Sequence, residues 1–149
     1  PFINLIFKIE IQFIRKIPLN STKTTKTKNG ISYKSSPRKF ITLAFEDDGS
    51  KTTAEIYGAF PVSDSIHLFA GIDKTTSTGV TNQETTGVAY ESCCWAFRIA
   101  HFKEKKSSGP GYNYSTGFEL VLSGLGSTAT PLKDRIENKI PDYSANLRY

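Results

Sequence analysis

The sequence predicts an all-β fold, namely an antiparallel, up-and-down transmembrane β-barrel to which this chain supplies about eight strands before an irregular C-terminal tail. Three observations lead to this prediction. Polar and apolar residues alternate with a period of two through most of the 149 residues, which is the pattern of strands. Gly, Pro, Asn, Asp and Ser, the residues that favour turns, separate the alternating segments. No strand segment shows long helical periodicity.

The first alternating segment is Ile3–Lys16, in which apolar residues occupy the odd positions from Ile3 to Phe13. A period of two over more than ten residues predicts a strand, although Ile6 and Ile14 interrupt its polar side. The segment is long for a soluble strand but matches a tilted membrane strand, which needs about 9–11 residues plus its ends. The polar, threonine-rich and basic segment Asn20–Gly30 is predicted to be a loop.

Seven further segments continue the alternation, and turns or loops connect them. The segments are Ile31–Lys34, Phe40–Phe45, Ala54–Phe60, Ile66–Asp73, Thr85–Glu91, Trp95–Ala100 and Tyr112–Ser123. The composition of Ser35–Arg38, Glu46–Ser50 and Pro61–Asp64 predicts tight turns. Longer loops are expected at Thr75–Asn82 and Lys103–Gly111.

The chain changes character after residue 123. Residues 1–123 are assigned to barrel strands, and whether residues 1–30 belong to the same barrel is left open. Residues 124–149 form the tail, which is polar and contains Pro131 and Pro141. Within this tail, Leu132–Ile140 has room for one or two helical turns.

Each predicted strand has one apolar face and one face of small or polar residues. The second face carries few charges, and its small residues are Gly71, Gly87, Ala89, Ala96, Ser115, Gly117 and Ser123. An apolar side toward lipid and a small, polar side toward a lumen are typical of a membrane barrel. Aromatic residues also lie near the predicted strand ends, as in the interfacial girdles of membrane proteins. They are Phe60, Tyr90, Trp95, Tyr112 and Tyr114.

Other architectures fit the same alternation. In a soluble β-barrel or sandwich, the apolar faces would form a core or a ligand cavity, so a soluble ligand-binding module is the alternative. An unrelated outer-membrane porin-like fragment is a further one. The longest apolar runs are far shorter than the roughly 20 residues of a membrane-spanning helix. The net charge of +5 agrees with ordinary solubility or with attraction to anionic surfaces.

The two cysteines of the chain, Cys93 and Cys94, are adjacent and precede its single tryptophan, Trp95. Neighbouring Cα atoms lie about 3.8 Å apart, whereas an unstrained disulfide prefers roughly 5.5–6 Å. If both cysteines are oxidised, each therefore needs a partner elsewhere, and this chain offers none. Because the chain also begins at Pro1 and contains no Met, we expect it to be a piece of a longer protein.

The sequence supports no enzymatic activity. A zinc site needs about four ligands, and His67 and His101 are the only imidazoles that could join the cysteines. A nucleophilic cysteine would need a positioned base, and nothing in the sequence supports one. No compact basic and aromatic platform for nucleic acid is visible either. We therefore expect no catalytic residue, no metal, no cofactor and no nucleic-acid partner.

Around the cysteine pair the sequence resembles the C-terminal barrel region of the LPS-assembly outer-membrane protein family, LptD (OstA/Imp). The resemblance covers the chain from about Ile31 onward and depends on both the motifs and their spacing. The matching stretches are Ala54–Asp64, Leu68–Gly71, Gly87–Arg98 and Gly117–Leu125. Adjacent cysteines between two barrel strands are a far more specific signal than alternation alone.

The resemblance implies a large single-chain barrel in the outer membrane of a Gram-negative bacterium. Such a barrel inserts lipopolysaccharide (LPS) into the outer leaflet through a lateral gate. The implied partners are an LptE-type lipoprotein inside the barrel, periplasmic LPS-bridge proteins that act through an N-terminal domain, LPS itself and outer-membrane lipid. Residues 124–149 would then be periplasmic or associated with the lumen.

The resemblance also implies roles for particular residues. Cys93 and Cys94 would form disulfides with two cysteines near the N-terminus of the longer protein. The last strand would meet the first strand of the barrel at the lateral gate. The residues on one face of that last strand are Tyr112, Tyr114, Thr116, Phe118, Leu120 and Leu122.

Charged residues complete the candidate site. Arg98 is expected to face the lumen and to pair with Glu91 or Glu119, which are also expected there. Loop lysines are usually solvated, but some of them could instead contact LPS phosphates at the cell surface. The candidates for that contact are Lys103, Lys105 and Lys106.

Overall fold

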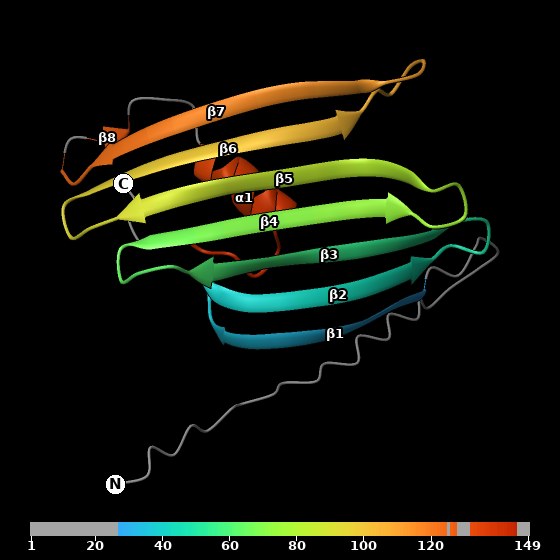
Figure 1. Cartoon of the computed structure of the whole chain (residues 1–149), viewed down its shortest axis with the longest axis horizontal. Helices are drawn as coiled ribbons and strands as arrows, with labels where there is room; N and C mark the ends of the chain where they lie inside the picture. Colours follow the sequence, from blue (N-terminus) through green and yellow to red (C-terminus); the bar gives the residue numbers. More distant parts are fainter. Residues whose placement is uncertain (1–26, 125, 128–131, 146–149) are drawn as a thin grey trace, which may run out of the picture.

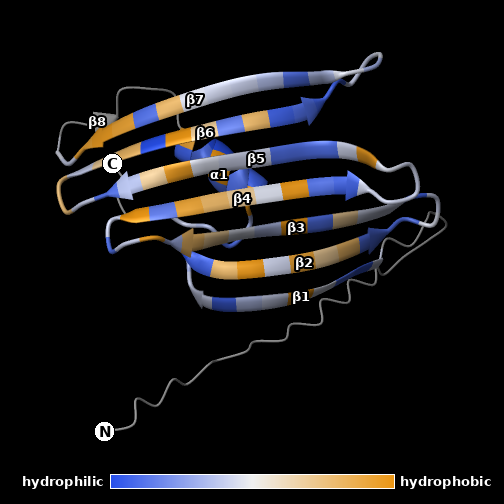
Figure 2. Ribbon diagram, viewed as in Figure 1, coloured by the Kyte–Doolittle hydropathy of each residue, from blue (hydrophilic) through white to orange (hydrophobic). Residues whose placement is uncertain are grey.

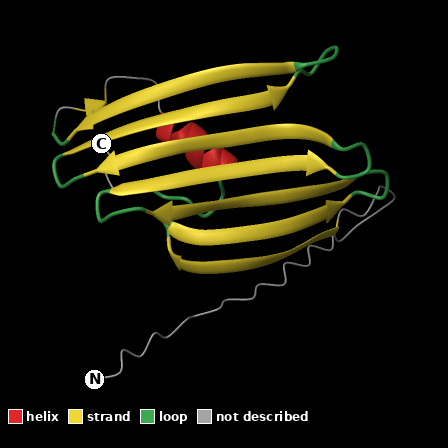
Figure 3. Ribbon diagram, in the orientation of Figure 1, coloured by secondary structure: helices red, strands yellow, loops and turns green. Residues whose placement is uncertain are grey.

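The computed structural model describes residues 27–124, 126–127 and 132–145. The strand that the sequence predicts at Ile3–Lys16 lies outside these residues. The described residues form one antiparallel sheet with a single short helix against it (Figures 1 and 3). The prediction of an all-β, antiparallel, up-and-down fold is therefore confirmed.

Strands β1 to β8 lie in the sheet in the order in which they occur along the chain. Seven of them are long, and the eighth is a two-residue strand beside β7. Their bounds are β1 Thr27–Ser36, β2 Lys39–Asp47, β3 Thr52–Pro61, β4 Ile66–Thr75, β5 Val80–Glu91, β6 Trp95–Lys105, β7 Tyr112–Leu122 and β8 Gly126–Ser127. Among the described residues, β1 and β8 are the two edges of an open sheet, so this part of the chain does not by itself close into a barrel.

Several strands are longer than the sequence predicts. Thr27–Gly30 belongs to β1 rather than to a loop, since these residues pair in register with β2 and Lys28 forms a 2.6 Å ion pair with Glu55. The connection between β4 and β5 is only residues 76–79, because Gly79 adopts a positive φ of 68° that permits a tight turn. Strand β6 likewise continues to Lys105, so the following loop is shorter than predicted.

Helix α1, Leu132–Lys139, covers one face of the sheet, which we call the inner face (Figure 1). Leu132, Ile136 and Ile140 are four residues apart, so they share one side of the helix and point into the core. Asp134 in the first turn and Lys139 in the last complement the helix dipole. The sequence allowed one or two helical turns here, and the structure has two.

The hydrophobic core lies between the inner face and the C-terminal segment. Its members are Phe40, Ala59, Phe69, Ala89, Ala100, Phe102, Leu132, Ile136, Ile140, Tyr143 and Ala145. Small residues of the inner face make room for this segment: a Cβ added at Gly117 would lie 2.9 Å from Leu132 Cδ1, and one at Gly71 would lie 3.4 Å from Ile140 Cγ1. The small residues predicted for a wide lumen therefore accommodate the chain's own C-terminal segment.

The opposite, outer face is apolar and exposed, and no described element covers it. Apolar and polar residues alternate along the strands, as the ribbon colours show for β4 and β6 (Figure 2). On the outer face, large apolar side chains remain accessible, from 37% for Phe97 to 66% for Phe118. Within the described ranges no helix is long and apolar enough to cross a membrane.

Candidate functional site

The outer face carries an apolar belt that extends from β2 to β7. The belt consists of Ile41, Leu43, Phe45, Ile56, Gly58, Phe60, Ile66, Leu68, Ala70, Ile72, Val88, Tyr90, Trp95, Phe97, Ile99, Phe118, Leu120 and Leu122. The face predicted to meet lipid is thus the face that the structure leaves exposed. A soluble monomer rarely exposes an apolar surface of this extent.

The belt runs diagonally across the strands. On β2 its central residue is Leu43. If the cross-strand partner of Leu43 is followed from strand to strand, the row reaches Tyr114 on β7. On β5 and β6 that row contains Glu84 and Lys103, so it is no longer apolar there. The central belt residue of β7 is Leu120, six residues beyond Tyr114.

Aromatic side chains lie toward both ends of the sheet. The short turns at 37–38, 62–65 and 92–94 define one end of the sheet, which we call the cysteine end. Phe60 lies near this end, as do Tyr90 and Trp95, whose ring centroids are 4.5 Å apart. Near the opposite end, Tyr114 stacks on His101 with 6.1 Å between the ring centroids. This distribution agrees with the predicted girdles.

The cysteine turn, residues 92–94, joins β5 to β6. Its backbone is held by Ser92, whose N–H and Oγ–H both donate to the Trp95 carbonyl, and by the Ser123 N–H, which donates to the Cys94 carbonyl. Both thiols are exposed and free, with 2.6 Å between the Sγ atoms, longer than the roughly 2.05 Å of a disulfide. The contact with Cys93 raises the pKa of the Cys94 thiol above its ordinary value.

A buried ion cluster lies on the inner face of β5, β6 and β7. The guanidinium of Arg98 donates to Glu119 at 2.7 Å through Nη1 and to Glu91 at 3.0 Å through Nη2. None of the three side chains is more than 2% exposed. The predicted pairing of Arg98 is therefore confirmed, with both carboxylates rather than one. Arg38 adds a longer contact, 3.7 Å, to Glu91.

A second buried polar contact joins the sheet to the C-terminal segment, and sequence reasoning missed it. His67 Nε2 and the Tyr143 hydroxyl are 2.7 Å apart, and both side chains are buried. Within the described part of the chain, His67 Nδ1 is buried without a hydrogen-bond partner. Burial raises the pKa of the Tyr143 phenol well above its ordinary value of 10.

Two basic side chains of helix α1 bind it to the strands. Lys139 Nζ lies 2.6 Å from a Glu104 carboxylate oxygen, and Arg135 donates to Ser115 Oγ at 3.0 Å. The Arg135 guanidinium also lies 3.8 Å from the centroid of the Phe102 ring. Sequence reasoning missed these contacts, although the four-residue spacing of Leu132 and its apolar neighbours is the signal that could have indicated a packed helix.

The last long strand, β7, lies beside β6 on one side and beside β8 on the other, where the register covers Val121 and Leu122. The residues predicted for one face of this strand do share the outer face. Tyr114 and Phe118 are 62% and 66% exposed.

The three candidate lysines are not one cluster. Lys103 lies on the outer face, 3.4 Å from Glu84 and 4.7 Å above the Tyr112 ring. Lys105 ends β6, and Lys106 begins the following loop, where its backbone N–H donates to the Gly111 carbonyl. All three occupy the end of the sheet opposite the cysteine turn. In the described residues no group of His, Cys, Asp and Glu could hold a metal ion.

Comparison with known proteins identifies relatives but no family model. No protein-family model matches the chain. It is 30% identical over 110 residues to "LPS-assembly protein LptD" of Pseudoalteromonas translucida, which covers 65% of this chain and 15% of that protein. The LptD of Legionella pneumophila (strain Lens) is 32% identical over 95 residues, or 60% of this chain and 11% of the relative. For the LptD of Aeromonas hydrophila the values are 27% over 77 residues, 49% and 10%.

The chain therefore spans about 15% or less of the length of these curated relatives. The matches indicate an LptD-like relationship over about half to two thirds of the chain, and they suggest a link to LPS assembly. They come from Gram-negative bacteria, which agrees with the resemblance drawn from the cysteine motif.

Proposed function

We propose that this chain forms part of the wall of a transmembrane β-barrel in the outer membrane of a Gram-negative bacterium. In this proposal the complete barrel inserts LPS into the outer leaflet and has no enzymatic activity. The LptD relatives support the link to LPS, and the diagonal apolar belt supports the membrane barrel. The belt is the observation that carries the proposal.

The slope of the belt has a physical explanation. From β2 to β7 the centre of the belt moves by six residues along the strands, which is about 20 Å. Over the same interval it crosses five strand spacings, which is about 24 Å. The belt is therefore inclined by about 40° to the direction perpendicular to the strands. Strands of membrane barrels tilt by about 35–45° from the membrane normal. A belt that lies level in a bilayer must then cross such strands at this slope. Neither soluble alternative requires that relationship.

The proposed passage of lipid depends on β7 and its outer face. The resemblance to LptD implies that the last strand meets the first strand of the complete barrel, and that their seam is the lateral exit for LPS. In this arrangement the apolar residues of β7 guide acyl chains into the bilayer. Lys103, Lys105 and Lys106 lie at the end of the sheet where LPS phosphates would emerge.

The inner face limits where a lumenal partner can dock. Helix α1 and residues 140–145 already cover the core of this face. An LptE-type lipoprotein, the partner implied by the resemblance, would therefore meet the exposed polar side of α1, where Asp134 and Asn138 lie, rather than the strands themselves. The periplasmic bridge proteins would act through parts of the longer protein beyond this chain.

The cysteine turn provides a direct test of the LptD assignment. Cys93 and Cys94 are exposed at a turn, so both thiols are accessible to cysteines from a separate domain. We propose that each forms a disulfide with a cysteine near the N-terminus of the longer protein. Peptide mapping by mass spectrometry under non-reducing conditions, on protein from its native envelope, would identify the partners.

Two distant upstream partners are the expected result of that mapping. Two free thiols, or links between copies of this chain alone, would count against the LptD assignment. Extraction of the same envelopes separates the soluble alternative: the proposed wall needs detergent for release, whereas a ligand-binding module would stay monodisperse in plain buffer.

A further inference from the structure

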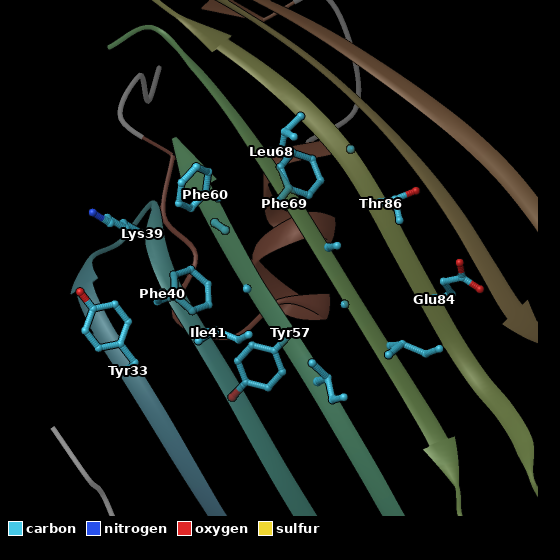
Figure 4. A pocket seen from close by; sticks show the side chains of 17 residues that line it. Tyr33, Lys39, Phe40, Ile41, Tyr57, Phe60, Leu68, Phe69, Glu84 and Thr86 are labelled. Carbon is cyan, nitrogen blue, oxygen red and sulfur yellow. The ribbon is translucent and has the colours of Figure 1, made fainter. Parts of the chain in front are cut away.

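We propose that the outer face of β1–β5 holds one acyl chain of an anionic phospholipid, whose phosphate lies at Lys39. This inference depends on the proposed membrane location and adds a specific lipid site to it. The site is a groove of about 840 Å³ in the apolar belt (Figure 4). We call it the acyl groove.

The acyl groove exists because two small residues interrupt the belt. Gly58 on β3 and Ala70 on β4 are cross-strand partners, so their missing side-chain volume adds up at one place. Large side chains border this gap on both sides along the strands. On the side of the cysteine end these are Phe60 and Leu68, and on the opposite side Ile56 and Ile72.

The acyl groove opens on the outer face and not toward the core. Its walls are outward-pointing side chains, and Phe60, Leu68 and Ile56 among them are 45–61% exposed. No residue of α1 lines it. Residues of the inner face also line the groove, and Phe69 is one of them. Phe69 is only 2% exposed and belongs to the core. It therefore forms part of the floor of the groove, between the small outer residues.

The length of the groove suits one lipid chain. It extends from Tyr33 on β1 to Thr86 on β5, which is four strand spacings or about 19 Å. The hydrocarbon core of a bilayer is about 30 Å thick, so the chains of one leaflet extend over about 15 Å. Because the strands tilt, a groove perpendicular to them runs obliquely through the belt rather than level with it. A chain lying in it therefore descends into the leaflet.

The charges at the two ends of the groove give it a direction. Lys39 is exposed at the start of β2, beside the turn at the cysteine end, where a lysine can reach an interfacial phosphate. Glu84 lies at the other end, 3.4 Å from Lys103, so the lysine beside that end already has a carboxylate partner. Charge complementarity thus selects an anionic headgroup at Lys39, with the chain extending past Gly58 and Ala70. An uncharged lipid lacks this contact, and a zwitterionic lipid gains less from it because its own cation accompanies the phosphate.

The test uses the full-length protein in phosphatidylcholine vesicles that contain a trace of phosphatidylglycerol with a photoreactive group midway along one acyl chain. After illumination, mass spectrometry locates the labelled residues. The site predicts that this probe labels β3 and β4 around the groove more strongly than the outer face of β6 and β7. Labels spread evenly around the belt would overturn the proposal.

Three variants sharpen the result. Ala70→Trp fills the groove and should remove the concentrated labelling, whereas Ile99→Trp adds a ring to the belt outside the groove and should leave it unchanged. Lys39→Gln should reduce labelling by the phosphatidylglycerol probe about fivefold and should reduce labelling by a phosphatidylcholine probe with the same chains by less. Unchanged labelling of Ala70→Trp, or an unchanged ratio of the two probes in Lys39→Gln, contradicts the site.

The experiment distinguishes an error in the proposed lipid site from an error in the proposed membrane location. If the protein enters the vesicles but labels are not concentrated at the groove, the lipid site is wrong and the barrel wall stands. If the protein does not enter the vesicles at all, both are wrong. Cross-links from β3 and β4 to another protein chain, in place of lipid labels, would show that a second protein covers the groove.

Discussion

Arg98 on β6 donates a hydrogen bond of 2.7 Å to Glu119 on β7, and neither side chain is accessible to solvent. The two residues are direct cross-strand partners, and Glu91 on β5 completes the cluster on the other side of Arg98. A buried charge is tolerated only when it is paired and hydrogen-bonded. The cluster therefore links three neighbouring strands near the cysteine end of the sheet.

Removing one carboxylate of this cluster should be costly. We expect Glu119→Ala to lower the free energy of unfolding by about 3–5 kcal/mol, toward the lower limit because Glu91 still accompanies Arg98. Denaturant titration of the full-length protein in lipid checks this. The control is Glu84→Ala, which removes an exposed pair with Lys103 and should change the free energy by no more than about 1 kcal/mol. Equal effects for the two variants would contradict the role of burial.

Gly87 should not tolerate even one additional methyl group. A Cβ at this position would lie 2.5 Å from the Ile99 carbonyl oxygen and would also collide with the Phe69 ring. Gly87→Ala should therefore lower the free energy of unfolding by about 1–3 kcal/mol, the usual cost of overpacking. Gly117→Ala is the matched control, because its close neighbour is the flexible end of Leu132. Thermal or denaturant unfolding that ranks Gly117→Ala as the more damaging change would refute this explanation.

Tyr143 should make the fold sensitive to alkaline pH. Burial raises the pKa of its phenol above 10, the ordinary value in the unfolded state. The protonated phenol therefore makes its full contribution to the free energy of unfolding below pH 10. At higher pH the unfolded state releases the proton first, and stability falls as the pH rises toward the pKa of the folded state. The loss of stability above pH 10 should be smaller for Tyr143→Phe than for the unchanged protein. Unfolding free energies measured between pH 8 and about 11 would show parallel curves if Tyr143 were not responsible.

Tyr143→Phe also has an expected effect at neutral pH. The substitution leaves the buried His67 Nε2 without its partner at 2.7 Å. Since an unsatisfied buried polar atom costs about 1–3 kcal/mol, the free energy of unfolding should decrease by that amount. Tyr114→Phe, a change at a side chain that is 62% exposed, provides the control for loss of a hydroxyl.

A charge in the middle of the apolar belt should be disruptive. Leu68 is outward-facing and 47% exposed, so an arginine there finds room but no water in a bilayer. We expect Leu68→Arg to lower the free energy of unfolding in lipid by about 2–4 kcal/mol, whereas Asp47→Arg at the end of β2 should cost about 0–1 kcal/mol. If Leu68→Arg were neutral, as on a water-exposed surface, the membrane location would be in error.

The strand pattern and the two faces could be predicted from sequence because both depend on local alternation. Side chains of a strand point alternately to opposite sides, so the apolar positions of β4 and β6 identify one face directly. The pairing of Arg98 could also be predicted, since Glu91 and Glu119 are carboxylates near it on the same face.

The strand ends and the inner-face packing could not be predicted in the same way. The end of β1 depends on partners in β2 and β3, such as Glu55 for Lys28, and those partners are defined only by the register. The contact between His67 and Tyr143 joins residues 76 positions apart, which no local pattern reveals. The acyl groove likewise required the register, because Gly58 and Ala70 become neighbours only when β3 pairs with β4.

The central claim is that the apolar belt meets lipid. Its most direct test is residue-by-residue footprinting of the intact protein in a bilayer, with hydroxyl radicals to mark water-exposed side chains and a lipid-borne carbene to mark lipid-exposed ones. The account predicts carbene labels on Phe97, Ile99 and Phe118, and hydroxyl-radical modification at Tyr114 beyond the belt. Hydroxyl-radical modification of Phe97, Ile99 and Phe118 as strong as that of Tyr114 would contradict it.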